Sequence, residues 1–350
     1  GVVVVVVSIL LAHVSKYVIE ERFRHARKGE SFRPYVIGAG LTATLALFAT
    51  GLTFAGDQRI EADQQRIAVM EDYPGALAWK GHLVPADVAV IPTPDAARVD
   101  RPRLHGANER CIAPIEGSVI VRCVMGMETG RHTLVLIGDS HAEHWIPAFD
   151  AAASNMGWKL LVFTKMGCAF TDVQIQSGSP RTGLSAYPQC AEWSSKLVAE
   201  LLKLNPDLVV ISQSPNHRIE GQGSRGSQQK IAEGVLRRLK PLRRQGIQVA
   251  LLRHTPWLPA SGPDCVKMGS DCVFSASAVL PQAALNMAIQ IDPDLQSLDM
   301  TSSLCREDRC PAVVGNILVY RDQHHLTATY ARTMADDVQS AVIALLKKER

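Results

Sequence analysis

The stretch Leu134-Val-Leu-Ile-Gly-Asp-Ser-His-Ala142 joins a short apolar run to a glycine and a polar tripeptide. A continuous apolar run of this length is typical of a strand that is buried on both faces of a sheet. Helix-like periodicity follows over residues 142–156, and Gly138 permits a tight turn before it. The stretch therefore predicts a strand, a turn and a helix, with Ser140 close to the helix N-terminus.

The same alternation continues along the chain. Apolar runs typical of strands cover residues 158–163, 208–211 and 247–252, and helical patterns cover residues 190–204, 228–245 and 327–348. Buried strands that alternate with helices predict a doubly wound α/β domain with a parallel sheet. In such domains ligands bind at the carboxyl ends of the strands, which is where Ser140 falls.

Two apolar segments precede this domain, residues 1–18 and 36–55. The second has 20 residues and no charge, enough to cross a hydrocarbon core of roughly 30 Å as a helix. The first begins without Met or a basic region, so we expect a fragment of a longer membrane protein. The loop between them is basic. It contains Arg22, Arg24, Arg27, Lys28 and Arg33, and Lys16 lies just before it. Basic loops stay in the cytoplasm, which predicts that everything after Ala55 lies outside it.

The eight cysteines agree with that orientation, because all of them follow residue 110. Neighbour pairing is the simplest of the 105 possible arrangements, and an oxidising compartment would preserve such bonds. A zinc site is the weaker interpretation, since no Cys-x-x-Cys or Cys-x-x-His pair occurs, and we predict no metal. The predicted pairs are Cys111–Cys123, Cys168–Cys190, Cys265–Cys272 and Cys305–Cys310.

Residues 57–110 form a mixed, proline-containing region that we interpret as a linker partly packed on the domain. The formal net charge is +3, and no basic stripe with interleaved aromatic residues occurs. Nucleic-acid binding is therefore not expected.

Ser140 is a candidate nucleophile, because a helix N-terminus favours a developing oxyanion. The alternative is an N-cap, in which Asp139 or Ser140 satisfies the first-turn amides. A serine nucleophile needs a base, and His325 lies three residues after Asp322, a spacing that lets the carboxylate orient the imidazole. His324 is the rival base, and the Asp–His pair has a local cap as its alternative role.

These two motifs together resemble the SGNH/GDSL hydrolase superfamily, in which serine and histidine occupy the first and last motif blocks. Gly138-Asp-Ser-His-Ala142 matches the first block and Asp322-x-x-His-Leu326 the last. Val14-Ser-Lys-Tyr-Val-Ile-Glu-Glu-Arg-Phe-Arg24 resembles the end of the acyltransferase family 3 membrane domain, although Glu21 stands where that pattern has proline. The chain thus resembles the C-terminal part of a membrane acyltransferase with a fused periplasmic SGNH domain.

The resemblance implies an SGNH hydrolase-like, flavodoxin-like domain over residues 111–350, with Ser140 as nucleophile, His325 as base and Asp322 as orienting acid. The oxyanion hole would comprise the N–H groups of Ser140 and Gly167. The third block normally supplies asparagine in Gly-x-Asn-Asp, but this chain has Ser212-Gln-Ser-Pro-Asn-His217. Gln213 or Asn216 would then be the amide donor.

The function that the resemblance implies is O-acetyl transfer to an envelope polysaccharide, such as O-antigen, lipopolysaccharide or exopolysaccharide. We expect a serine-esterase-like acyltransferase for groups other than amino-acyl groups, anchored in the lipid bilayer of the bacterial inner membrane with its domain in the periplasm. No cofactor is expected in the domain, and acetyl-CoA would be the cytoplasmic acyl donor for the membrane part. The alternatives are a membrane-anchored carbohydrate esterase or deacetylase and a non-catalytic glycan-positioning module.

Overall fold

The structure is a computed structural model that describes residues 71–103, 111–179 and 183–347, together with residues 16, 40, 42–44, 46, 47 and 50. Both predicted membrane helices and the basic loop between them lie almost entirely outside these residues. Within the described part of the chain, no helix has the length and apolar character needed to cross a bilayer. The chain divides into two units, Gly1–Arg59 and Ile60–Arg350, and the second carries the fold described here.

A six-stranded sheet forms the centre of this unit, in the order β1-β3-β2-β6-β7-β9. Five strands are parallel and have the order 2-1-3-4-5 along the chain, which is the flavodoxin-like arrangement. The sixth, β1, pairs antiparallel with β3. The strands are β1 Cys123–Gly126, β2 Thr133–Gly138, β3 Lys159–Thr164, β6 Leu208–Ser212, β7 Gln248–Leu252 and β9 Gln296–Leu298.

The prediction of a wholly parallel sheet is therefore wrong at one edge, because the sheet is mixed and mostly parallel. Strand β1 alternates between buried and more exposed residues, whereas β2 and β6 are buried almost throughout. An edge strand with one solvated face lacks the continuous apolar run that marked the central strands. Its sequence therefore gave no comparable signal.

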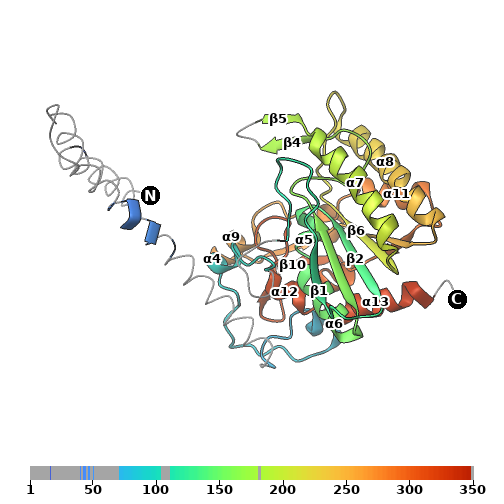
Figure 1. The fold of residues 1–350 in the computed structure, drawn as a ribbon. Helices are drawn as coiled ribbons and strands as arrows, with labels where there is room; N and C mark the ends of the chain where they lie inside the picture. Colours follow the sequence, from blue (N-terminus) through green and yellow to red (C-terminus); the bar gives the residue numbers. More distant parts are fainter. Residues whose placement is uncertain are drawn as a thin grey trace. The chain divides into compact units, whose positions relative to one another are not determined.

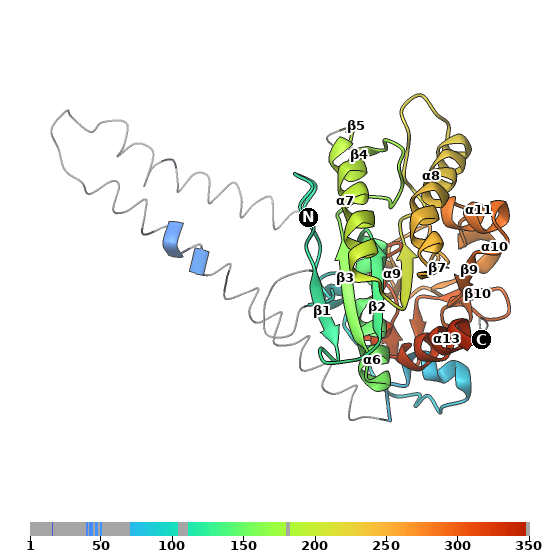
Figure 2. The same ribbon diagram turned by 45° about the vertical axis from the view of Figure 1, so that its right-hand side comes forward.

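Helices cover both faces of the sheet (Figures 1 and 2). Leu134 and Leu136 of β2 face one core and Val135 and Ile137 face the other, as expected from the alternation of side chains along a strand. The first core includes side chains from α6 Ile146–Met156, α12 Ala328–Arg332 and α13 Ala335–Lys347. The second includes side chains from α7 Pro188–Leu204, α8 Ser224–Arg244 and α11 Ala284–Ile291.

Two of the predicted helices are interrupted. The helix expected over residues 142–156 is divided into α5 Ser140–Glu143 and α6, with Pro147 in the first turn of α6. Proline has no backbone N–H to continue the hydrogen bonding of a preceding turn, which suits it to a helix start. The last predicted helix is likewise divided, into α12 and α13.

Short elements complete the described residues. They are η2 Gly75–Lys80, α4 Pro94–Ala97, β4 Gln176–Ser179, β5 Gly183–Ala186, α9 Gly262–Lys267, β8 Val273–Ser275, α10 Ala276–Val279, η3 Thr301–Ser303, β10 Arg309–Pro311, β11 Val313–Val314 and β12 Ile317–Leu318. Three small sheets pair β4 with β5, β8 with β10, and β11 with β12.

The segment 71–103, within the region interpreted as a linker, packs against the C-terminal part of the domain. Ile91 forms a parallel bridge with Ile317. The carboxylate of Asp100, which is fully buried, accepts a hydrogen bond of 3.0 Å from the backbone N–H of Thr329 in α12. This segment is therefore part of the folded unit.

Four disulfides hold loops around the sheet, and the described residues include no free cysteine. The Cys168–Cys190 bond joins the turn after β3 to the first turn of α7. The others are Cys111–Cys123, Cys265–Cys272 and Cys305–Cys310.

Candidate active site

Ser140 is the first residue of α5 and follows directly from the end of β2. The turn requires glycine, because Gly138 has a φ of 150° and a Cβ there would lie 1.6 Å from the carbonyl oxygen of Ser212. Asp139 is the N-cap of α5, and its Oδ1 accepts a hydrogen bond of 2.8 Å from the N–H of His141. Asp139 thus supplies the cap, and the hydroxyl of Ser140 remains available for another partner.

That partner is His325, whose Nε2 lies 2.8 Å from the Oγ of Ser140. The other ring nitrogen, Nδ1, lies 2.7 Å from Oδ2 of Asp322. The second oxygen of Asp322 accepts hydrogen bonds of 2.8 Å from the backbone N–H groups of His324 and His325. The carboxylate therefore fixes both the turn and the imidazole, and the three side chains are arranged so that Asp322 orients His325 and His325 can accept a proton from Ser140.

The electrostatics of this turn keep Asp322 ionised. Partial burial acts to raise the pKa of Asp322, but the hydrogen bond to His325 and the charge of that ring outweigh burial and hold the pKa well below its usual range. An ionised carboxylate at Nδ1 keeps the proton on that nitrogen and leaves the lone pair of Nε2 directed at Ser140. His325 is thereby oriented to accept the proton of the hydroxyl.

His324, the rival base, faces a different neighbour. Its Nδ1 lies 3.0 Å from Nε2 of His141, and the two rings are nearly parallel, with an interplanar angle of 7°. Trp257 stacks on His324 at a centroid distance of 3.9 Å. Burial lowers the pKa of His324 to about 4, against the raising effect of Asp322. The structure thus gives His325, and not His324, the contact with Ser140.

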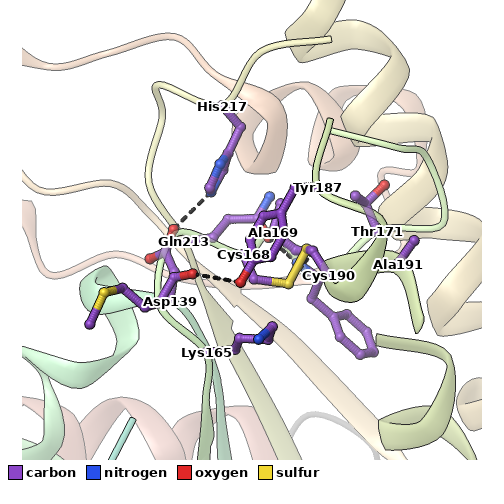
Figure 3. Close-up of a disulfide and its surroundings, with 12 residues drawn as sticks. Asp139, Lys165, Cys168, Ala169, Thr171, Tyr187, Cys190, Ala191, Gln213 and His217 are labelled. Carbon is purple, nitrogen blue, oxygen red and sulfur yellow. Dashed lines mark hydrogen bonds and ion pairs between the residues drawn. A yellow bond between two sulfur atoms is a disulfide. The ribbon is translucent and has the colours of Figure 1, made fainter. Parts of the chain in front are cut away.

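The loop after β6 is tied to the residue before Ser140. Oδ2 of Asp139 accepts a hydrogen bond of 2.9 Å from the N–H of Ser214 and lies 2.8 Å from Nε2 of His217. Figure 3 shows His217 pointing at this carboxylate, with Gln213 beside it. Gln228 of α8 donates a hydrogen bond of 2.7 Å to the carbonyl of His217 and anchors the loop from behind. Asp139 therefore links the first and third motif blocks.

The predicted oxyanion donors lie in three different settings. Gly167 adopts a φ of 59° in the turn after β3, next to the Cys168–Cys190 disulfide. Gln213 is fully buried, and its Oε1 accepts a hydrogen bond of 2.9 Å from the N–H of Phe170. Its Nε2 has no hydrogen-bond partner among the described residues. Asn216 is exposed. Of the two amides, only Gln213 is held in one orientation by the fold.

Sequence reasoning assigned no role to His141, His217 or Trp257. His217 was visible as the end of the unusual third block, and its contact with the buried Asp139 shows why a polar residue stands there. His141 directly follows the candidate nucleophile, yet its neighbour His324 is 183 residues away. No local pattern identifies such a contact.

Comparison with protein families gives a match to the SGNH domain (fused to AT3 domains) over residues 105–340. The chain belongs to this family. Its central unit is an SGNH hydrolase-like α/β domain, and the membrane acyltransferase part that the resemblance implied is not shown in this chain. No curated protein matches the chain.

The search of solved structures also found similar chains. The periplasmic domain of a Salmonella ser. Paratyphi A lipopolysaccharide acetyltransferase is 13% identical, covers 62% of this chain and 85% of its own, and has a TM-score of 0.49. A Bacteroides fragilis acylhydrolase is 14% identical over 63% of this chain and 91% of its own, with a TM-score of 0.37. The acetyl xylan esterase AlAXEase is 15% identical, and the match covers 60% of this chain and 99% of the esterase, with a TM-score of 0.34.

Proposed function

We propose that this domain is an acyl-handling enzyme of the serine-esterase type and that it transfers an acyl group, most simply acetyl, to a hydroxyl of a cell-envelope polysaccharide. The observation that carries the proposal is the chain of contacts from Ser140 Oγ to His325 Nε2 at 2.8 Å and from His325 Nδ1 to Asp322 at 2.7 Å. The family, in which the domain is fused to AT3 domains, favours transfer over hydrolysis.

In the first half-reaction the Oγ of Ser140 attacks the acyl carbonyl while Nε2 of His325 takes the hydroxyl proton. The leaving group receives that proton from His325, and the acyl group remains bound to Ser140 as an ester. The negative charge that develops on the carbonyl oxygen would be stabilised by the N–H of Ser140 at the start of α5, with Gly167 and Gln213 as the further candidate donors.

In the second half-reaction a sugar hydroxyl attacks the Ser140 ester. His325 accepts the proton of that hydroxyl and returns it to the departing Oγ of Ser140, which restores the free enzyme. A membrane acyltransferase part drawing on cytoplasmic acetyl-CoA would supply the acyl group. The domain would then work in the periplasm beside the inner membrane, a location with which the four disulfides agree.

Ser140→Ala in the full-length membrane protein tests the proposal. We expect transfer of acetyl to the polysaccharide to be lost and a serine-reactive phosphonate to label only the unsubstituted protein. Transfer at the wild-type rate by the variant would remove Ser140 from the mechanism and favour a glycan-positioning domain. Release of free acetate that is faster than transfer, in the unsubstituted protein, would instead favour the carbohydrate esterase.

A further inference from the structure

Three imidazole rings meet beside Ser140, more than the proposed reaction uses. Each of His141, His324 and His325 has a ring nitrogen that lies within 4.8 Å of the corresponding atoms of the other two. His141 comes from α5, whereas His324 and His325 come from the turn before α12. The reaction requires only His325, so the positions of the other two rings call for a separate explanation.

The cluster has the features of a three-histidine metal site. Zinc is bound by imidazole nitrogens at about 2.0–2.1 Å, and a tetrahedral arrangement places two such nitrogens roughly 3.3 Å apart. The Nε2 of His141 and the Nδ1 of His324 are now 3.0 Å apart, so a small outward shift would admit the ion. His141 is 2% exposed and has little freedom to turn away.

The surroundings of the cluster also suit a cation. Asp322 accepts a hydrogen bond from the distal nitrogen of His325, the same carboxylate–histidine arrangement that orients the ligands of protein-bound zinc. The carboxylates of Asp322 and Asp139 both place negative charge near His324. Arg321 is a buried cation next to Asp322, and a carboxylate oxygen of Glu143 lies 3.9 Å from its guanidinium. Glu143 therefore offsets the charge of Arg321, and Asp322 remains as a negative charge beside the cluster.

We propose that His141, His324 and His325 bind a zinc ion, and that the bound ion switches the enzyme off reversibly by occupying Nε2 of His325. Each ring donates one lone pair to the ion. Because Nε2 of His141 and Nδ1 of His324 are hydrogen-bonded to each other, the ring that now donates must shift its proton to its distal nitrogen, by exchange with solvent, when the ion binds. Ser140 lies beside the cluster, with its Oγ 2.8 Å from Nε2 of His325. While the ion is bound, His325 cannot take the proton of Ser140. The inhibitory consequence rests on the proposed function, but the binding does not.

The test uses the full chain after removal of metal by a chelator. Titration calorimetry with Zn²⁺ is expected to show one saturable site, and Co²⁺ to give the visible absorption of a tetrahedral nitrogen site. His324→Gln removes one ligand while keeping a polar side chain of similar size, and it should weaken Zn²⁺ binding at least about 100-fold. His132→Gln is the matched control, because His132 is a surface residue that contacts Asp207 and lies outside the cluster. The affinity of the His132→Gln variant for Zn²⁺ should equal that of the unsubstituted chain.

The two proposals are separated by measuring binding in the Ser140→Ala background, where no reaction occurs. One saturable site in that variant, weakened by His324→Gln, supports the metal site even if the domain proves not to be an esterase or transferase. Absence of a saturable site, or affinity unchanged by His324→Gln, overturns it. In the unsubstituted chain, Zn²⁺ at concentrations near its dissociation constant should slow phosphonate labelling of Ser140, and a chelator should restore it. Labelling that is insensitive to bound Zn²⁺ overturns the inhibitory role.

Discussion

The Nε2 atom of His217 lies 2.8 Å from Oδ2 of Asp139, the residue that directly precedes Ser140. This contact joins the loop after β6 to the turn that presents the candidate nucleophile. Asp139 is fully buried and His217 is 7% exposed, so water cannot readily replace the imidazole. A buried carboxylate that loses a partner costs free energy unless the turn rearranges.

His217→Phe should therefore lower the kcat of acyl transfer by about 10- to 100-fold, because small displacements of a nucleophile cost rates of this order. KM should change less, since His217 lies behind the turn and contacts Asp139 rather than the substrate. His217→Gln offers an amide hydrogen near the position of Nε2 and should recover most of the activity. Equal losses in both variants would contradict a role for the hydrogen bond to Asp139, and thermal denaturation would show whether both variants are simply less stable.

Replacing Asp322 by asparagine should lower acyl transfer by about 10²–10⁴-fold while the fold is retained. The asparagine oxygen can still accept hydrogen bonds from the backbone N–H groups of His324 and His325, but its NH₂ group is a donor and cannot accept one from the N–H of Nδ1 of His325. The rate of Ser140 labelling by a phosphonate measures the effect. An unchanged rate would leave the Asp–His pair with a purely local capping role.

The stability of the domain should fall as the pH drops from about 6.5 to about 4. Burial lowers the pKa of His254 to about 4, while the unfolded chain has the ordinary value near 6.5. In this window the unfolded state binds a proton that folded His254 does not, so the free energy of unfolding decreases with falling pH. Because a tenfold change in proton affinity corresponds to about 1.4 kcal/mol, the loss from this residue is on the order of 3 kcal/mol.

Urea denaturation across this pH range measures the loss, and His254→Asn should reduce it. Asparagine can keep a hydrogen bond to the carbonyl of Gln213, which lies 3.0 Å from Nδ1 of His254, but it does not titrate. His132→Asn, at a surface histidine, serves as the control and should leave the slope unchanged. A His254→Asn slope equal to that of the unsubstituted protein would place the acid sensitivity elsewhere, the fully buried His141 and His144 being the next candidates, because burial lowers the pKa of both well below the ordinary value.

The Cys168–Cys190 bond should stabilise the domain more than the Cys305–Cys310 bond does. The first closes a segment with a sequence separation of 22 and the second one with a separation of 5. On the chain-entropy account, their loss costs about 3 and about 2 kcal/mol respectively. Paired alanine substitutions compared by denaturant unfolding test this order, and a reversed order would mean that native packing, rather than loop closure, dominates.

The parts of the site that could be predicted from the sequence are those built by neighbours along the chain. Ser140 follows a buried strand and a glycine, and Asp322 and His325 share one turn. Each of these two motifs can therefore be recognised from neighbouring residues in the sequence. Their meeting at 2.8 Å depends on the sheet order, and only the family resemblance linked them beforehand. The antiparallel edge strand β1 carried no continuous apolar run, and the sequence analysis missed it.

The remaining contacts are long-range, and no spacing rule identifies them. His141 and His324 are adjacent only because the end of β2 and the turn before α12 lie at the same edge of the sheet. The third block departs from Gly-x-Asn-Asp, which made its amide donor ambiguous, and the fold holds Gln213 while leaving Asn216 exposed. The predicted membrane helices stay predictions, because they fall almost entirely outside the described residues.

The contact between Asp100 and the N–H of Thr329 bears on how the domain should be produced in isolation. The family match begins at residue 105, so a recombinant fragment cut at that boundary would lack Asp100 and the rest of the segment 71–103. Thr329 lies four residues after His325, and the missing carboxylate would leave its amide exposed at the first turn of α12. Fragments for biochemistry should therefore begin upstream of residue 71. Low activity in a shorter fragment would reflect the loss of part of the folded unit and would not show that the enzyme is inactive.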